Sequence, residues 1–136
     1  QMFEGLIEFI EGSVFGLINQ IETEQEQGLA QLRAILAMLL GFAAKNPGMV
    51  RVLIGDALVN ENERLQVRIN QLHDRIEASL KQALRVAASQ GHAVTDAGAE
   101  ANLMLCYVVG RWHQFAKSGF KKNPAEGFER QWLRLS

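Results

Sequence analysis

The sequence predicts an all-α fold. The two prolines, Pro47 and Pro124, both stand in apparent turns, and long runs of Leu, Ala, Glu and Gln favour helices. Apolar side chains recur at spacings of three and four, as they do on one face of an α-helix. With 136 residues and a hydrophobic share of 48%, the chain is large enough for one domain with a substantial core. We therefore expect five or six helices in a single unit.

The first two helices are expected over residues 2–23 and 26–45. The core side of the first carries Phe3, Leu6, Ile7, Ile10, Val14, Leu17, Ile18 and Ile21, and that of the second carries Leu29, Leu32, Ile35, Leu36, Leu39, Leu40 and Ala43. The first helix begins without a capping residue, so we expect further sequence to precede residue 1. Asn46-Pro47-Gly48 ends the second helix, because proline disfavours α geometry at the residue before it.

A short third helix over residues 49–58 and a long fourth helix over 61–89 are expected next. Asn60 caps the long helix, and Glu63 stands three residues later, as in a capping box. Apolar residues follow near heptad spacing, at Leu65, Ile69, Leu72, Ile76, Leu80 and Leu84. Both a central helix packed on its own chain and an intermolecular coiled coil account for this repeat. Gln90-Gly91 ends the helix, because glycine readily adopts the left-handed conformation.

The fifth helix is expected over residues 96–118, with Thr95 as its cap and Gly119 as its terminator. A final helix is expected from Asn123, because Asn123, Pro124 and Glu126 provide a cap, a first-turn proline and a third-position acid.

The fifth helix is unusual because it is apolar on two sides. One side carries Ala97, Ala101, Met104, Val108, Trp112 and Phe115, and the roughly opposite side carries Leu103, Cys106, Tyr107 and Gly110. The final helix adds Phe128, Trp132 and Leu133 on one side. A helix that is apolar all round is buried all round. Both a central position in a monomer and a position between two copies of the chain satisfy that condition.

Small and apolar residues also occur away from the core side of the first two helices. Phe9 lies more than roughly 100° from the centre of the first apolar stripe. Its neighbours on that flank are Gly5, Gly12, Ser13 and Gly16, and the second helix carries Met38, Gly41 and Lys45 off its own stripe, with Asn46 at its end. If the two helices pack side by side, these flanks border a shallow groove that fits a peptide. Alternatively, Phe9 packs against a preceding domain.

Two segments carry a family resemblance: MFEGLIEFIEGS at residues 2–13 and LLGFAAKNPGMVRVLIGDALVNENERLQVRINQL at residues 39–72. Together they resemble the nucleoid-occlusion branch of the TetR family of regulators. The resemblance implies that residues 1–136 form a C-terminal regulatory and dimerisation domain, with a four-helix bundle at the interface of a homodimer. It also implies that a DNA-binding helix-turn-helix domain, absent from this chain, precedes residue 1.

The same resemblance implies a partner for the groove, the C-terminal tail of the tubulin-like division protein FtsZ. The matching positions are Phe9, Met38, Gly41, Lys45 and Asn46, and Ser13 stands beside them. Lys45 stands where arginine is common in the family, and Met38 where leucine is common. The implied location is the nucleoid in the cytoplasm.

An enzyme is not expected. The three histidines are not paired at metal-binding spacings, Cys106 lies in an apolar helix, and no nucleophile elbow or phosphate loop occurs. No cofactor is expected. No membrane span is expected either, because no apolar run approaches the ~20 residues that a span requires. The alternative function is a conventional repressor that binds a small apolar metabolite. Its pocket would be lined by Phe42, Val52, Leu53, Leu65, Ile69 and Tyr107.

Overall fold

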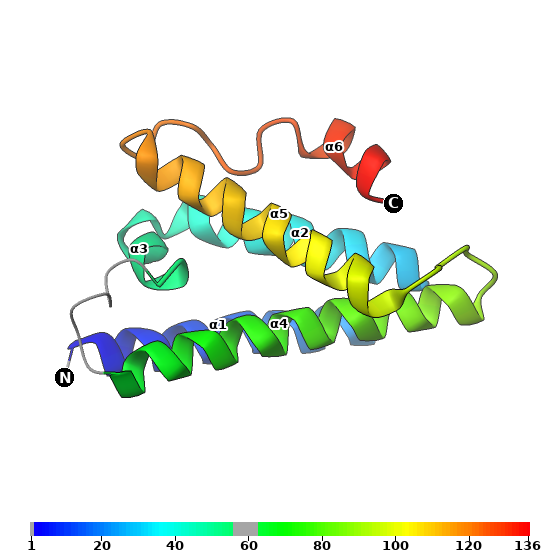
Figure 1. Ribbon diagram of the computed structural model, residues 1–136, viewed down its shortest axis with the longest axis horizontal. Coiled ribbons are helices and arrows are strands. Elements are labelled where there is room, and N and C mark those ends of the chain that lie inside the picture. The colour runs from blue at the N-terminus through cyan, green and yellow to red at the C-terminus, as the bar shows by residue number, and fades with distance from the viewer. Residues whose placement is uncertain (1, 56–62) are drawn as a thin grey trace.

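The computed structural model describes residues 2–55 and 63–136, and every regular element in these ranges is helical, which confirms the all-α prediction (Figure 1). The helices are α1 (Met2–Glu24), α2 (Gly28–Lys45), the 3₁₀-helix η1 (Pro47–Met49), α3 (Val50–Leu53), α4 (Glu63–Ser89), α5 (Ala97–Lys117) and α6 (Phe128–Leu135).

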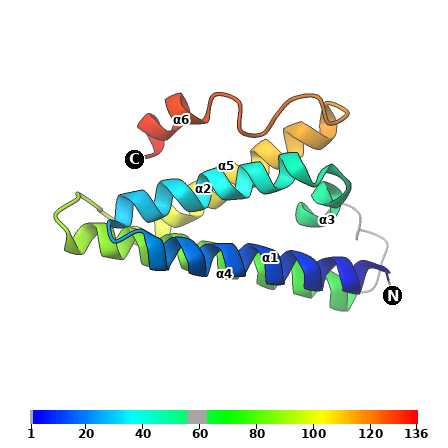
Figure 2. The same cartoon turned by 180° about the vertical axis from the view of Figure 1, so that it is seen from behind.

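The four long helices form two layers. Helices α1 and α4 lie side by side in one layer, and α2 and α5 cover them in the other (Figures 1 and 2). The apolar repeat of α4 is fully buried in this arrangement, at Leu65, Ile69, Leu72, Ile76, Leu80 and Leu84. Helix α4 therefore packs on its own chain.

The predicted core side of α5 is also buried. Met104, Val108 and Trp112 are at most 1% exposed. The Trp112 Nε1–H donates a hydrogen bond of 3.0 Å to the carbonyl oxygen of Leu39 in α2. This bond satisfies the one polar atom of the largest core side chain and fixes α5 against α2.

Two helix starts differ from the prediction. Asp96, and not Thr95, is the cap of α5, because the Asp96 carboxylate accepts a hydrogen bond from the Ala99 N–H at 3.1 Å. Helix α6 begins at Phe128 instead of Asn123. The Asn123 side chain accepts from the Ala125 N–H at 2.8 Å, and this local bond closes a turn instead of a helix.

The third helix, α3, follows the 3₁₀-helix η1 and ends at Leu53, so it is shorter than expected. The expected cap Asn60 and residues 56–58 of the predicted third helix lie outside the described residues. Gly91 ends α4 as predicted, with φ at +95° and a bond from the His92 N–H to the Ala87 carbonyl.

Helix α2 is the one described helix that is long and apolar enough, by length and composition alone, to cross a membrane. Of its 18 residues, 44% are buried inside the fold, where α2 packs on α1, α4 and α5. This position in the core accounts for its apolar composition.

Candidate functional site

The predicted groove residues lie on an antiparallel hairpin formed by α1 and α2 (Figure 2). Phe9 lies 15 residues before the end of α1, and Lys45 lies 17 residues after the start of α2. At a rise of ~1.5 Å per residue, the two positions stand at about the same height along the hairpin. Phe9 and Lys45 therefore lie near the same end of the hairpin.

A hollow of about 340 Å³ lies between these flanks, lined by Leu17, Ala37, Met38, Gly41, Phe42 and Lys45. Met38, Gly41 and Lys45 were predicted to share this place. Leu17 was assigned to the core, but 38% of it is exposed. At ~100° per residue, Leu17 lies roughly 80° from Phe9 and roughly 20° from the buried Ile10, so helical spacing alone did not distinguish Leu17 from the core.

Phe9, Ser13 and Asn46 do not line the hollow itself. Phe9 is 50% exposed, and Ser13 lies between Phe9 and Leu17 on the same flank of α1. The side-chain amide of Asn46 donates a hydrogen bond to the Phe42 carbonyl oxygen at 2.9 Å, at the C-terminal end of α2. Phe9 and Ser13 thus extend the exposed flank, whereas Asn46 has a local structural role.

The glycines of this surface meet open space within the chain. A Cβ added at Gly5, Gly12, Gly16 or Gly41 would have no heavy atom of another segment within 4 Å. Packing inside the domain therefore does not explain why glycine occupies these positions, where alanine would favour the helix.

The other flank of α1 is bound to α4. The Arg68–Glu11 ion pair measures 2.8 Å, Arg64 pairs with Glu4, and the guanidinium of Arg75 lies 3.8 Å from the centre of the Phe15 ring. These contacts fix the rotation of α1, so that the flank with Phe9 and Leu17 faces outward.

The second predicted surface lies on α5 and α6. Leu103 is 55% exposed, Leu133 is 74% exposed, and Cys106 and Gly110 are also exposed, while Tyr107 and Trp132 are half-buried. Phe128 differs from this group because it is 5% exposed and packs within its own core. Burial raises the pKa of Tyr107 above its ordinary value of 10.0, although the nearby Arg111 lowers it in part.

The residues expected to line a metabolite pocket form part of the core. Phe42, Val52, Leu53, Leu65 and Ile69 are at most 8% exposed and belong to one hydrophobic cluster, against which Tyr107 packs.

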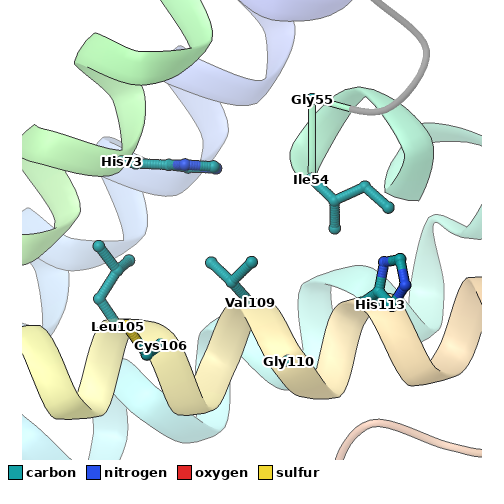
Figure 3. A pocket seen from close by; sticks show the side chains of 8 residues that line it. All are labelled: Ile54, Gly55, His73, Leu105, Cys106, Val109, Gly110 and His113. Carbon is teal, nitrogen blue, oxygen red and sulfur yellow. The ribbon is translucent and has the colours of Figure 1, made fainter. Parts of the chain in front are cut away.

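A different hollow of about 710 Å³ opens between α4, α5 and the end of α3 (Figure 3). It is lined by Ile54, Gly55, His73, Leu105, Cys106, Val109, Gly110 and His113. A nitrogen of His73 lies 2.6 Å from the Leu53 carbonyl oxygen, and His113 stands at the other end of the hollow (Figure 3). Among the described residues no group of three potential metal ligands occurs.

Comparison with known proteins identifies the family. Residues 26–136 match the SlmA-like family model described as a tetracyclin repressor-like C-terminal domain. The nucleoid occlusion factor SlmA of Alteromonas mediterranea is 47% identical over 134 residues, which cover 97% of this chain and 69% of the relative. The SlmA proteins of Idiomarina loihiensis and Vibrio vulnificus are 46% and 45% identical, over 97% and 100% of this chain and 68% and 70% of theirs. The chain therefore belongs to the SlmA family of nucleoid occlusion factors.

Proposed function

We propose that this domain is the dimerisation and partner-binding part of a nucleoid occlusion factor, and that the groove between α1 and α2 binds the C-terminal tail of FtsZ. Through this contact the protein hinders division-ring assembly over the chromosome. In this proposal residues 1–136 are the regulatory domain, and a helix-turn-helix domain on their N-terminal side binds DNA and holds the protein at the nucleoid. The role is binding and not catalysis.

The observation that carries the proposal is an open, apolar groove that packing inside the domain does not explain. Leu17 and Met38 supply contact area from two helices, and the flexible thioether of Met38 adapts to different partners. Gly41 leaves room for close approach of a peptide backbone, because a Cβ there would meet no heavy atom of another described segment within 4 Å.

Charge supports one orientation of the bound tail. Lys45 is exposed and is the basic residue that lines the groove. An acidic side chain of the peptide or its terminal carboxylate therefore binds at the Lys45 end, and apolar side chains bind along Leu17 and Met38. A lysine ammonium lacks the planar fork of arginine, so this contact favours a negatively charged group on the peptide but does not fix that group's orientation.

The test is the affinity of an FtsZ C-terminal tail peptide, measured by fluorescence anisotropy. Phe9→Ala and Met38→Glu should each weaken binding about tenfold or more, since the first removes contact area on the exposed flank of α1 and the second places a charge in the apolar groove. Val67→Ala is a matched control, because Val67 is also 50% exposed but lies on α4. Unchanged affinity in both Phe9→Ala and Met38→Glu, with helix content intact, would contradict the proposal.

Dimerisation through α5 and α6 is the second part of the proposal. Leu103, Cys106 and Gly110 form an uncharged outward side of α5, and the neighbouring α6 exposes Leu133. A contiguous exposed apolar patch is typical of a protein interface, and we propose that these residues form one. Sedimentation equilibrium should give a dimer at micromolar concentration, and a monomer there would contradict this part.

The alternative, a domain that responds to a metabolite, is favoured by the 710 Å³ hollow between α4 and α5. Its volume is within the range of ligand pockets. A screen of small apolar metabolites by thermal shift separates the two functions. Stabilisation by a metabolite, together with no binding of the FtsZ tail, would select the repressor function.

A further inference from the structure

Arg111 is a buried arginine on α5 that faces the segment leading to α6. Its side chain and backbone together are 9% exposed. Its Nε–H donates to the carbonyl oxygen of Pro124 at 3.1 Å, and its Nη2 donates to those of Asn123 and Glu126 at 3.2 and 2.6 Å. Its Nη1 donates to the side-chain oxygen of Gln131 in α6 at 3.2 Å. One guanidinium therefore binds four oxygen atoms of the connection and of α6.

These partners explain how a cation is tolerated inside the fold. Burying a charge is costly unless it is well hydrogen-bonded, and the planar, five-donor guanidinium can meet several carbonyl oxygens at once. Lysine cannot replace it, because an ammonium has three donors on a single atom and no fixed fork.

The hydrogen bonds of Arg111 hold the connection between α5 and α6, which has little regular structure of its own. Residues 118–127 run back along α5 before α6 begins (Figure 1). Helix α6 has eight residues, and its N-cap, Gly127, has no side-chain capping bond. Such a short helix is not stable alone, so its position depends on contacts to the rest of the domain.

The rotation of α6 is fixed at Gln131. The side-chain oxygen of Gln131 accepts from both Arg111 and the Tyr107 hydroxyl, which stand one turn apart on α5. Because Gln131 faces α5, Leu133 two residues later points to the opposite side. Leu133 is accordingly 74% exposed.

We propose that Arg111 is the positioning residue of the dimer surface. It holds the turn at residues 123–126 and α6 against α5, so that Leu133 and Leu103 are presented to a second copy of this chain in one geometry. The inference rests on the dimerisation proposed above. Arg111 does not line the groove between α1 and α2, so dimerisation and peptide binding can be measured as separate effects of a change at Arg111.

The test combines two measurements on Arg111→Lys, with Arg85→Lys on the exposed side of α4 as the control. Sedimentation equilibrium gives the dimer dissociation constant, and hydrogen exchange with mass spectrometry gives the protection of residues 123–135. Arg111→Lys should weaken dimerisation about tenfold or more and speed exchange in residues 123–135. Exchange in α4 and the affinity for the FtsZ tail should remain those of the wild type.

A second variant guards against general destabilisation. Gln131→Ala removes one side-chain acceptor and should weaken the dimer in the same direction but less, with α4 unchanged. If the wild-type chain dimerises and Arg111→Lys dimerises equally tightly, the inference about Arg111 fails alone. If the wild-type chain is a monomer, the dimerisation proposal fails, and the inference about Arg111 fails with it.

Discussion

Gly28 stands at the start of α2 in direct contact with the backbone of α4. A Cβ at this position would lie 2.2 Å from the Ala87 nitrogen and 2.7 Å from the Ala83 carbonyl oxygen, and neither backbone atom can move independently. Gly16 on α1 is the opposite case, because a Cβ there would meet nothing within 4 Å. The two glycines therefore respond differently to the same substitution.

We predict that Gly28→Ala lowers the free energy of unfolding by about 2–3 kcal/mol, because overpacking forces α2 and α4 apart. Gly16→Ala should raise it by about 0.5–1 kcal/mol, through helix propensity alone. Urea denaturation followed by circular dichroism measures both. Equal stabilities of the two variants would show that the helices do not approach closely at Gly28.

Tyr107 reports on the environment between α5 and α6, and it is the one tyrosine of the sequence. Burial raises its pKa, so the folded state keeps the phenolic proton to higher pH than the unfolded state does. The stability contributed by the neutral phenol is therefore complete below the ordinary pKa of about 10 and is lost as the pH rises through the folded-state pKa.

The ultraviolet absorbance of the phenolate should accordingly show a midpoint above 10.0 in the native protein, and a return to the ordinary value in concentrated urea. Stability should decline with pH over the same range. A native midpoint at or below the unfolded one would contradict the burial of Tyr107 against α6.

At the scale of single elements, the start of α5 depends on two acidic side chains. Asp96 caps the Ala99 N–H, and the Glu100 carboxylate accepts from the backbone N–H groups of Thr95 and Asp96 at 3.1 and 3.3 Å. Together they satisfy the N–H group of Ala99 in the first turn of α5 and those of the two residues that precede the helix.

Asp96→Ala should therefore cost about 1 kcal/mol of unfolding free energy, whereas Thr95→Ala should stay within about 0.5 kcal/mol. Thermal denaturation of the two single variants and of Asp96→Asn, which retains a capping oxygen, provides the comparison. A larger loss for Thr95→Ala than for Asp96→Ala would restore Thr95 as the cap.

The elements were largely predictable because their signals are local. The period of apolar residues located α1, α2, α4 and α5, and Gly91 ended α4 as expected. The misplaced starts have local causes as well: neighbouring Thr95 and Asp96 compete for one cap, and Asn123 closes a turn before any helix forms. Short-range patterns alone do not rank such alternatives.

The site was predictable only in part, because tertiary packing decides which flank of a helix is covered. The sequence placed Met38, Gly41 and Lys45 together, and in the structure all three line the hollow between α1 and α2. It assigned Leu17 to the core, although that side of α1 remains partly open. It also gave no sign of Arg111, whose bonds join residues up to 20 positions apart.

At the scale of the whole molecule, a substitution at Gly110 should change monomer stability and dimer affinity in opposite directions. A Cβ at Gly110 would meet no heavy atom of another described segment within 4 Å, so Gly110→Ala should stabilise the monomer by about 1 kcal/mol. In the proposed dimer a second α5 approaches this position, and the added methyl group should weaken association. Sedimentation equilibrium and denaturation below the dimer dissociation constant measure the two effects. A Gly110→Ala dimer as tight as the wild type would place the interface elsewhere.

The central claim, that a partner binds on the outer side of α1 and α2, is tested most directly by the methyl signals of the methionines. Met38 lines the groove and is half-buried, whereas Met104 is 1% exposed in the core. Addition of the FtsZ tail peptide to protein labelled with ¹³C at the methionine methyl groups should shift the Met38 signal saturably and leave Met104 unchanged. A bound peptide that leaves the Met38 signal in place, or that shifts Met104 instead, would contradict the account.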